Sequence, residues 1–61
     1  MCLSNTYRES DHTLLMDNTS RIDIDGDLIR LRDLFGDVLE IRGRLVSTDL
    51  ERNEVIIRCE E

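Results

Sequence analysis

The 61-residue chain contains no proline, no lysine and only two aromatic residues, Tyr7 and Phe35. Its eight basic residues are all arginines, and fourteen acidic residues bring the formal net charge to -6. Proteins that bind nucleic acids need clustered basic side chains, and those that bind single strands add aromatic stacking surfaces. The composition therefore disfavours nucleic-acid binding. Without proline, the chain also has no obvious flexible boundary, and we expect a single domain over residues 1–61.

Long apolar runs are missing as well. No stretch is long enough to span a bilayer, and no basic segment leads into an apolar one as in a signal peptide. The expected location is the cytoplasm, where thiols stay reduced. Two cysteines are too few for the disulfide framework of a small secreted protein. Because so short a chain buries only about 60% of its unfolded surface, we expect a metal or a second subunit to support the fold.

Apolar residues alternate with polar ones in several short runs. Ile22 and Ile24 flank Asp23, while Ile57 and Cys59 fall on one side of the last run. We expect Ile29 and Ile57 to point to the inward side of their strands. Period-two alternation is typical of half-buried strands. We therefore predict strands near residues 3–7, 13–16, 21–24, 28–32, 38–42, 45–48 and 55–59. Turns are expected at residues 17–20, 25–26, 35–37 and 51–54, where glycine, aspartate and asparagine gather. The pattern predicts an all-β chain, a small and mostly antiparallel β-barrel of about six to seven short strands.

A cysteine stands directly behind the start methionine. A thiolate is a soft ligand suited to nickel, copper(I) or zinc. If Met1 is removed, the amine nitrogen and sulfur of Cys2 would close a five-membered chelate around a metal, and the backbone amide nitrogen of Leu3 could add a further ligand. Nitrogen and sulfur donors in one plane suit nickel(II). The alternative is that Cys2 is an ordinary small apolar side chain at the start of the first strand.

Five short segments stand in order along nearly the whole chain: MC at 1–2, LLMDN at 14–18, IRLRDLFGD at 29–37, IRGRL at 41–45 and DL at 49–50. Their order and spacing resemble the CooT family of small nickel-binding proteins, named for an accessory protein of carbon monoxide dehydrogenase. The resemblance implies an Sm-like or SH3-like β-barrel, a homodimer, and nickel binding through Cys2. Cys2 is the one functional residue that the resemblance to the family assigns in this sequence.

Two further residues could in principle bind a metal. His12 is the only histidine, but a single imidazole between polar residues in a turn is usually just solvated. Cys59 follows the apolar alternation of the last run, so we expect it to lie in the core. A disulfide or a shared metal between Cys2 and Cys59 would require the two ends of the chain to be adjacent.

We expect that the chain is not an enzyme, because it has no glycine-rich phosphate loop and no nucleophile motif, and a chain this small has little room to enclose a substrate. The favoured function is a nickel(II)-binding accessory protein or metallochaperone. Cys2 would hold Ni²⁺ at a homodimer interface, and an apo nickel enzyme such as carbon monoxide dehydrogenase would receive it. The alternative is a metal-free Sm-like adaptor that binds another protein; RNA binding would conflict with the negative charge.

Overall fold

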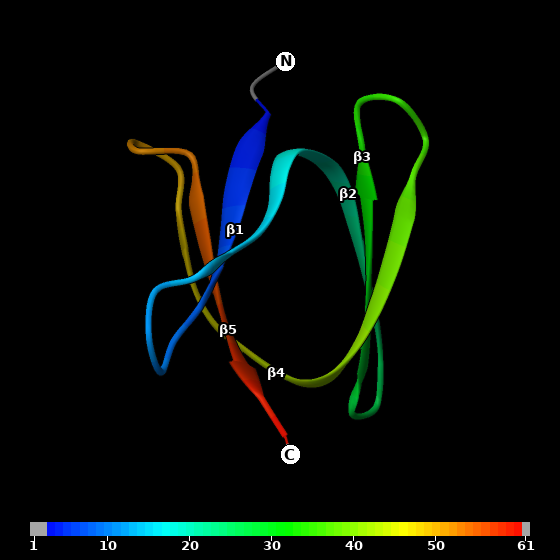
Figure 1. Ribbon diagram of the computed structural model, residues 1–61, viewed down its shortest axis with the longest axis vertical. Coiled ribbons are helices and arrows are strands. Elements are labelled where there is room, and N and C mark those ends of the chain that lie inside the picture. Colours follow the sequence, from blue (N-terminus) through cyan, green and yellow to red (C-terminus); the bar gives the residue numbers. More distant parts are fainter. Residues whose placement is uncertain (1–2, 61) are drawn as a thin grey trace.

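The computed structural model describes residues 3–60, which form five β-strands. The strands are β1 (Ser4–Arg8), β2 (Leu14–Asp25), β3 (Leu28–Asp33), β4 (Val38–Asp49) and β5 (Glu54–Cys59). Each strand pairs antiparallel with the next one. A parallel pairing of β1 with β5 closes the sheet into a barrel (Figure 1). The prediction of an all-β, mostly antiparallel fold is confirmed.

The predicted number of six to seven strands is wrong, because two expected breaks do not interrupt the ladder. Residues 17–20, expected as a turn, lie inside β2. The strand bends there: Asn18 has a φ of 51°, and the register shifts between Thr19 and Arg21. A bulge of this kind lets a strand curve without ending. In the same way β4 unites the runs expected at 38–42 and 45–48.

Gly43, in the middle of β4, is what allows that strand to pass close to β5. It is buried and pairs with Cys59 across the sheet. A Cβ atom at this position would collide with the backbone carbonyl oxygen of Arg58. A glycine inside a strand often marks such a close approach of two backbones.

The core is formed by β3 and β5. Ile29 and Leu31 from β3 and Val55 and Ile57 from β5 are almost completely buried. Met16, Ile22, Ile41 and Cys59 are half-buried and pack against these four. The sequence-based assignment of Ile29, Ile57 and Cys59 to the inward side is therefore confirmed.

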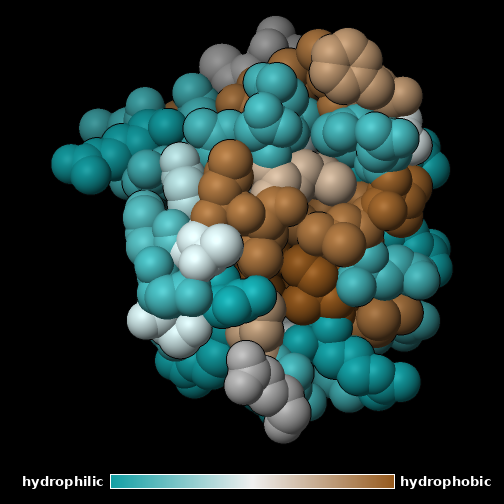
Figure 2. Space-filling view, in the orientation of Figure 1, coloured by the Kyte–Doolittle hydropathy of each residue, from teal (hydrophilic) through white to brown (hydrophobic). Residues whose placement is uncertain are grey.

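Apolar surface remains exposed around this small core. Figure 2 shows apolar atoms in the middle of one face, between β1 and β5 on the left and β2 and β3 on the right, with β4 crossing below. Ile24 pairs with the buried Ile29 and Leu45 with the buried Ile57, so both point inward. They nevertheless remain 55% and 39% exposed. Within residues 3–60 there is no helix long and apolar enough to cross a membrane.

Candidate metal centre

Cys2, the predicted metal ligand, lies outside the described residues. Its neighbour Leu3 is half-buried and immediately precedes β1. The surroundings of Leu3 therefore define the end of the barrel at which the predicted site would stand. We call this the N-terminal end; it is the upper end in Figure 1.

Hydrogen bonds tie the start of β1 to the two loops that border the N-terminal end. The backbone N–H of Asn5 donates to the carbonyl oxygen of Asn53 in the β4–β5 turn, at 2.9 Å. The Asn5 side-chain oxygen accepts from the Asn18 N–H at 3.4 Å. The Asn18 carbonyl in turn accepts from the N–H of Leu34, in the β3–β4 loop, at 3.0 Å. Both loops are thus held beside the start of β1.

The β3–β4 loop is ordered by the side chain of Asp33. One carboxylate oxygen accepts hydrogen bonds from the N–H groups of Phe35 at 2.8 Å and Asp37 at 3.0 Å. Gly36 takes the positive φ, 89°, that closes the loop. The result is an ordered loop whose tip points outward, with Leu34 and Phe35 56% and 80% exposed.

The β4–β5 turn is built in the same way. A carboxylate oxygen of Asp49 accepts hydrogen bonds from the N–H groups of Glu51 at 3.0 Å and Arg52 at 3.1 Å. Leu50, directly after Asp49, is 79% exposed. Two ordered apolar tips therefore flank the start of β1 (Figure 1). The sequence by itself predicts only turns in these segments, and the signal for the tips is an apolar residue directly behind a turn-forming aspartate.

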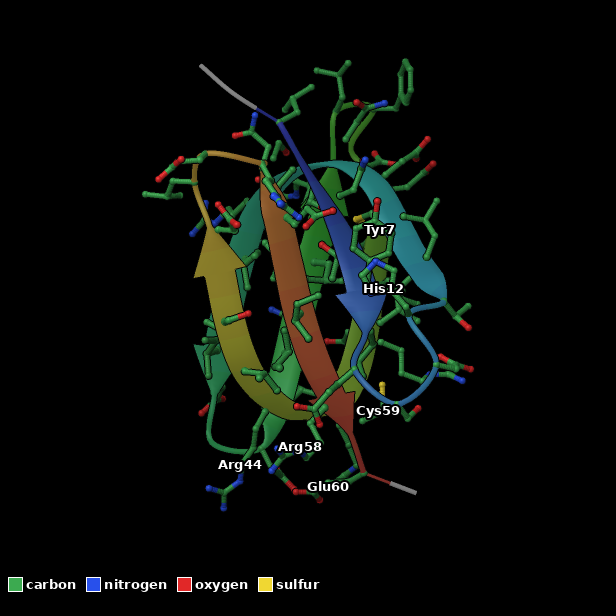
Figure 3. All side chains as sticks on the ribbon, turned by 90° about the vertical axis from the view of Figure 1, so that its left-hand side faces the viewer. Tyr7, His12, Arg44, Arg58, Cys59 and Glu60 are labelled. Atoms are coloured by element: carbon green, nitrogen blue, oxygen red, sulfur yellow. The ribbon has the colours of Figure 1, made fainter. Side chains whose placement is uncertain are left out.

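His12 lies away from the N-terminal end. It belongs to the turn after β1, where its N–H donates to the carbonyl oxygen of Arg8 at 2.8 Å. Its exposed ring stacks on that of Tyr7, with the ring centroids 4.3 Å apart and the planes at 6° (Figure 3). The structure thus gives His12 an aromatic contact and places it beside neither Leu3 nor the two loops at that end.

Cys59 is also remote from Leu3. Because β1 and β5 are parallel, with Arg8 level with Ile57, Cys59 lies beyond the end of β1 (Figure 3). At about 3.3 Å per residue, this register separates Leu3 from Cys59 by roughly 20 Å along the strands. The half-buried Cys59 instead borders a cleft of about 280 Å³ with Arg8, Glu9, Ser10 and Arg58. Leu3 and Cys59 therefore lie at different ends of the barrel.

The electrostatics of the Cys59 cleft are dominated by one ion pair. The guanidinium of Arg58 donates to both carboxylate oxygens of Glu9, at 2.8 and 3.2 Å. These hydrogen bonds hold the pKa of Glu9 below its ordinary value and raise that of Arg58. No group of three or more His, Cys, Asp or Glu side chains that could hold a metal occurs among residues 3–60.

Comparison with known proteins decides the family. The model of the family "CO dehydrogenase accessory protein CooT" matches residues 1–58. The chain belongs to the CooT family. An uncharacterized protein of Archaeoglobus fulgidus is 36% identical over 45 residues, which is 74% of this chain and 100% of that protein. The resemblance drawn from the five sequence segments is confirmed.

Proposed function

We propose that this CooT-family chain is a nickel(II)-binding accessory protein that acts in the maturation of a nickel enzyme such as carbon monoxide dehydrogenase. The match of the CO dehydrogenase accessory protein family over residues 1–58 carries the proposal. The chain would act as a carrier and not as an enzyme, in the cytoplasm. The closed all-β sheet supports the further proposal that the fold is of the Sm-like or SH3-like type.

Nickel is the cargo in this proposal, and the start of the chain would hold it. The Cys2 thiolate would supply a soft sulfur ligand and the amide of Leu3 a nitrogen ligand, and the amine of Cys2 would add a second nitrogen if Met1 is removed. Sulfur and nitrogen donors in one plane suit nickel(II). Cys59 lies roughly 20 Å from Leu3 along the strands and His12 stacks on Tyr7, so the proposed ligand set includes neither. Two copies that meet at their N-terminal ends would double the donor set, to four or more.

The exposed tips support association at that end. Phe35 and Leu50 are 80% and 79% exposed, and their loops are ordered by Asp33 and Asp49. An ordered loop that presents apolar side chains to water suits a contact with another protein surface. We propose that these tips pack against a second copy and bring the two chain starts together in a homodimer.

A nickel titration of untagged protein tests the metal proposal. We expect wild type to develop ultraviolet thiolate-to-nickel absorption and Cys2→Ser to lose it, because serine offers a hard, poorly ionised oxygen. Affinity should also fall at lower pH, since protons compete for the sulfur and nitrogen donors. His12→Ala and Cys59→Ala are the controls, and both should bind nickel as wild type does. Equal affinity of wild type and Cys2→Ser would reject the metal site.

Sedimentation at micromolar concentration, with a chelator present, tests the homodimer. Wild type should have twice the monomer mass, and the double variant Phe35→Ser/Leu50→Ser should shift to monomer. Leu14→Ser removes a leucine that is 50% exposed, at the start of β2, and should remain dimeric. A monomeric wild type would contradict the proposed interface. It would not contradict the binding of nickel by Cys2 of a single chain.

A metal-free protein adaptor is the second candidate function. The same exposed tips, Phe35 and Leu50, favour it, because they fit a heterologous partner as well as a second copy. Transfer of nickel to the apo form of carbon monoxide dehydrogenase separates the two functions. If wild type delivers nickel to the enzyme and Cys2→Ser does not, the chain is a carrier. If the chain binds the enzyme without carrying nickel, it is an adaptor.

A further inference from the structure

We propose that the N-terminal end of the barrel is a docking surface for a partner protein whose contact surface is both basic and apolar. The exposed apolar tips of the two loops would bury their side chains against the partner. The carboxylates around the tips would meet its arginine or lysine side chains. The proposal rests on the carrier function proposed above and deepens it, because it names the chemistry of the surface that a nickel-receiving enzyme would present.

The negative charge of the chain is concentrated at the N-terminal end. Three segments meet there beside the start of β1: the bend of β2 at 17–20, the β3–β4 loop at 33–38 and the β4–β5 turn at 49–54. Six acidic residues and one arginine in these segments give a net charge of -5: Asp17, Asp33, Asp37, Asp49, Glu51, Arg52 and Glu54. The formal net charge of the whole chain is -6. The rest of the chain is therefore almost neutral.

Ion pairs within residues 3–60 do not balance the charge at this end. Five ion pairs join side chains of that part of the chain, and none of them includes any of the seven charged residues just named. Asp33 and Asp49 accept hydrogen bonds from backbone N–H groups, which order the loops but leave the carboxylate charges in place. The N-terminal end therefore presents a net negative charge to a partner.

Apolar side chains project among these carboxylates. Leu34, Phe35 and Leu50 are 56%, 80% and 79% exposed, and each lies one or two residues behind an aspartate that orders its loop. Exposed apolar surface with a polar rim is typical of sites that bind other proteins, and aromatic side chains often act as the anchors. Because the loops are already ordered, docking would cost little conformational entropy.

The charge decides which kind of partner fits this surface. A nucleic acid or an anionic membrane would set phosphate groups against carboxylates, and a second copy would set two acidic ends against each other. Contacts between like charges are unfavourable. A protein surface with arginine or lysine around an apolar patch complements both the charge and the tips. Because the tips cannot face a second copy and such a partner at once, the partner would take the place of the second copy.

A basic peptide tests the surface without nickel. We would titrate the full chain, with a chelator present, with an acetylated and amidated hexapeptide of alternating arginine and leucine, and follow the glycine amide signals by NMR. Gly36, in the β3–β4 loop, should shift, while Gly26 and Gly43 at the opposite end of the barrel should not (Figure 1). Added salt should weaken binding, because ions screen exposed charges. The same peptide with glutamate in place of arginine should not bind.

Two double variants provide a matched comparison. Asp37→Asn/Glu51→Gln removes two exposed carboxylates from the N-terminal end and should weaken peptide binding about three- to tenfold. Asp25→Asn/Glu60→Gln changes the net charge equally at the opposite end of the barrel. Its two residues are also exposed and belong to no ion pair of residues 3–60. This variant should bind the peptide as wild type does.

Equal binding by the two double variants, salt-independent affinity or binding of the glutamate peptide would overturn the proposal. So would sedimentation that finds two copies of the chain in one particle at saturating arginine–leucine peptide. Phe35→Ser/Leu50→Ser tests the apolar part, and full binding by this variant would also contradict the docking surface. Cys2→Ser should lose nickel and still bind the peptide, so failure of the nickel function and failure of the docking surface are distinguishable.

Discussion

The hydroxyl oxygens of Thr6 and Thr19 lie 2.8 Å apart inside the barrel, between β1 and β2. Both residues are buried, at 0% and 4% exposure. The Thr19 oxygen also lies 3.4 Å from the carbonyl oxygen of Met16, to which it donates. The two hydroxyls share one hydrogen bond, in which either can donate, and Thr19 has a second partner on the backbone.

This arrangement predicts unequal effects of removing either hydroxyl. Thr19→Val leaves the buried Thr6 hydroxyl without its partner and should lower the free energy of unfolding by about 1–3 kcal/mol. Thr6→Val should cost less, because Thr19 keeps its bond to Met16. Urea denaturation of both single variants and the double variant measures the coupling, which should be about 1 kcal/mol. Strictly additive effects would show that the two hydroxyls do not interact.

Gly43 provides a test of the close approach between β4 and β5. In Gly43→Ala the new methyl group collides with the carbonyl oxygen of Arg58, which belongs to the backbone and cannot rotate away. We expect a loss of about 3 kcal/mol in the free energy of unfolding, measured by thermal or urea denaturation. Ser47→Ala, at an exposed position on the same strand, should change stability by no more than about 0.5 kcal/mol. A stable Gly43→Ala variant would mean that the two strands lie further apart.

The assignment of sides in β5 is tested by a buried charge. Ile57 is completely buried, so Ile57→Asp places an unpaired carboxylate in the core. That cost rivals the whole stability of a small domain, and the variant should lose its β-sheet circular dichroism. Leu50→Asp puts the same charge on an exposed tip and should fold normally. An unchanged melting temperature in Ile57→Asp would show that the inward side is wrongly assigned.

Glu9 should contribute to acid sensitivity. Hydrogen bonds from Arg58 hold the pKa of Glu9 below its ordinary value of 4.5 in the folded chain. A carboxyl group of this kind adds stability above its ordinary pKa and loses that contribution as the pH falls through its lower folded-state pKa. Glu9→Gln should therefore lose less stability than wild type when the pH is lowered from 7 to below 4.5. Melting temperatures across this range measure the difference. Glu51→Gln, which touches no ion pair of residues 3–60, should follow wild type.

Local pattern was sufficient to predict where the chain is extended and three of the four turns, at residues 25–26, 35–37 and 51–54, although it divided β2 and β4 into shorter strands. Alternation placed Ile29 and Ile57 inside, because successive side chains of a strand point to opposite sides whatever the rest of the chain does. Gly26 and Gly36 adopt the positive φ expected of tight turns. The local chemistry of a thiol beside the chain start also led to Cys2 and Leu3, and the five short segments led to the CooT family, which the family match confirmed.

The course of β2 and β4 depended on the tertiary structure. Residues 17–20 carry turn-forming side chains, yet they continue β2 through a bulge, because the strand must curve to pair with β1 on one side and β3 on the other. The parallel pairing of β1 with β5 likewise follows from closure of the whole sheet. That pairing puts Cys59 at the end of the barrel away from Leu3 and the turn with Leu50 at the near end. The pairing of β1 with β2 brings Thr6 beside Thr19. These are contacts between residues far apart in the chain, and periodicity within one strand carries no information about them.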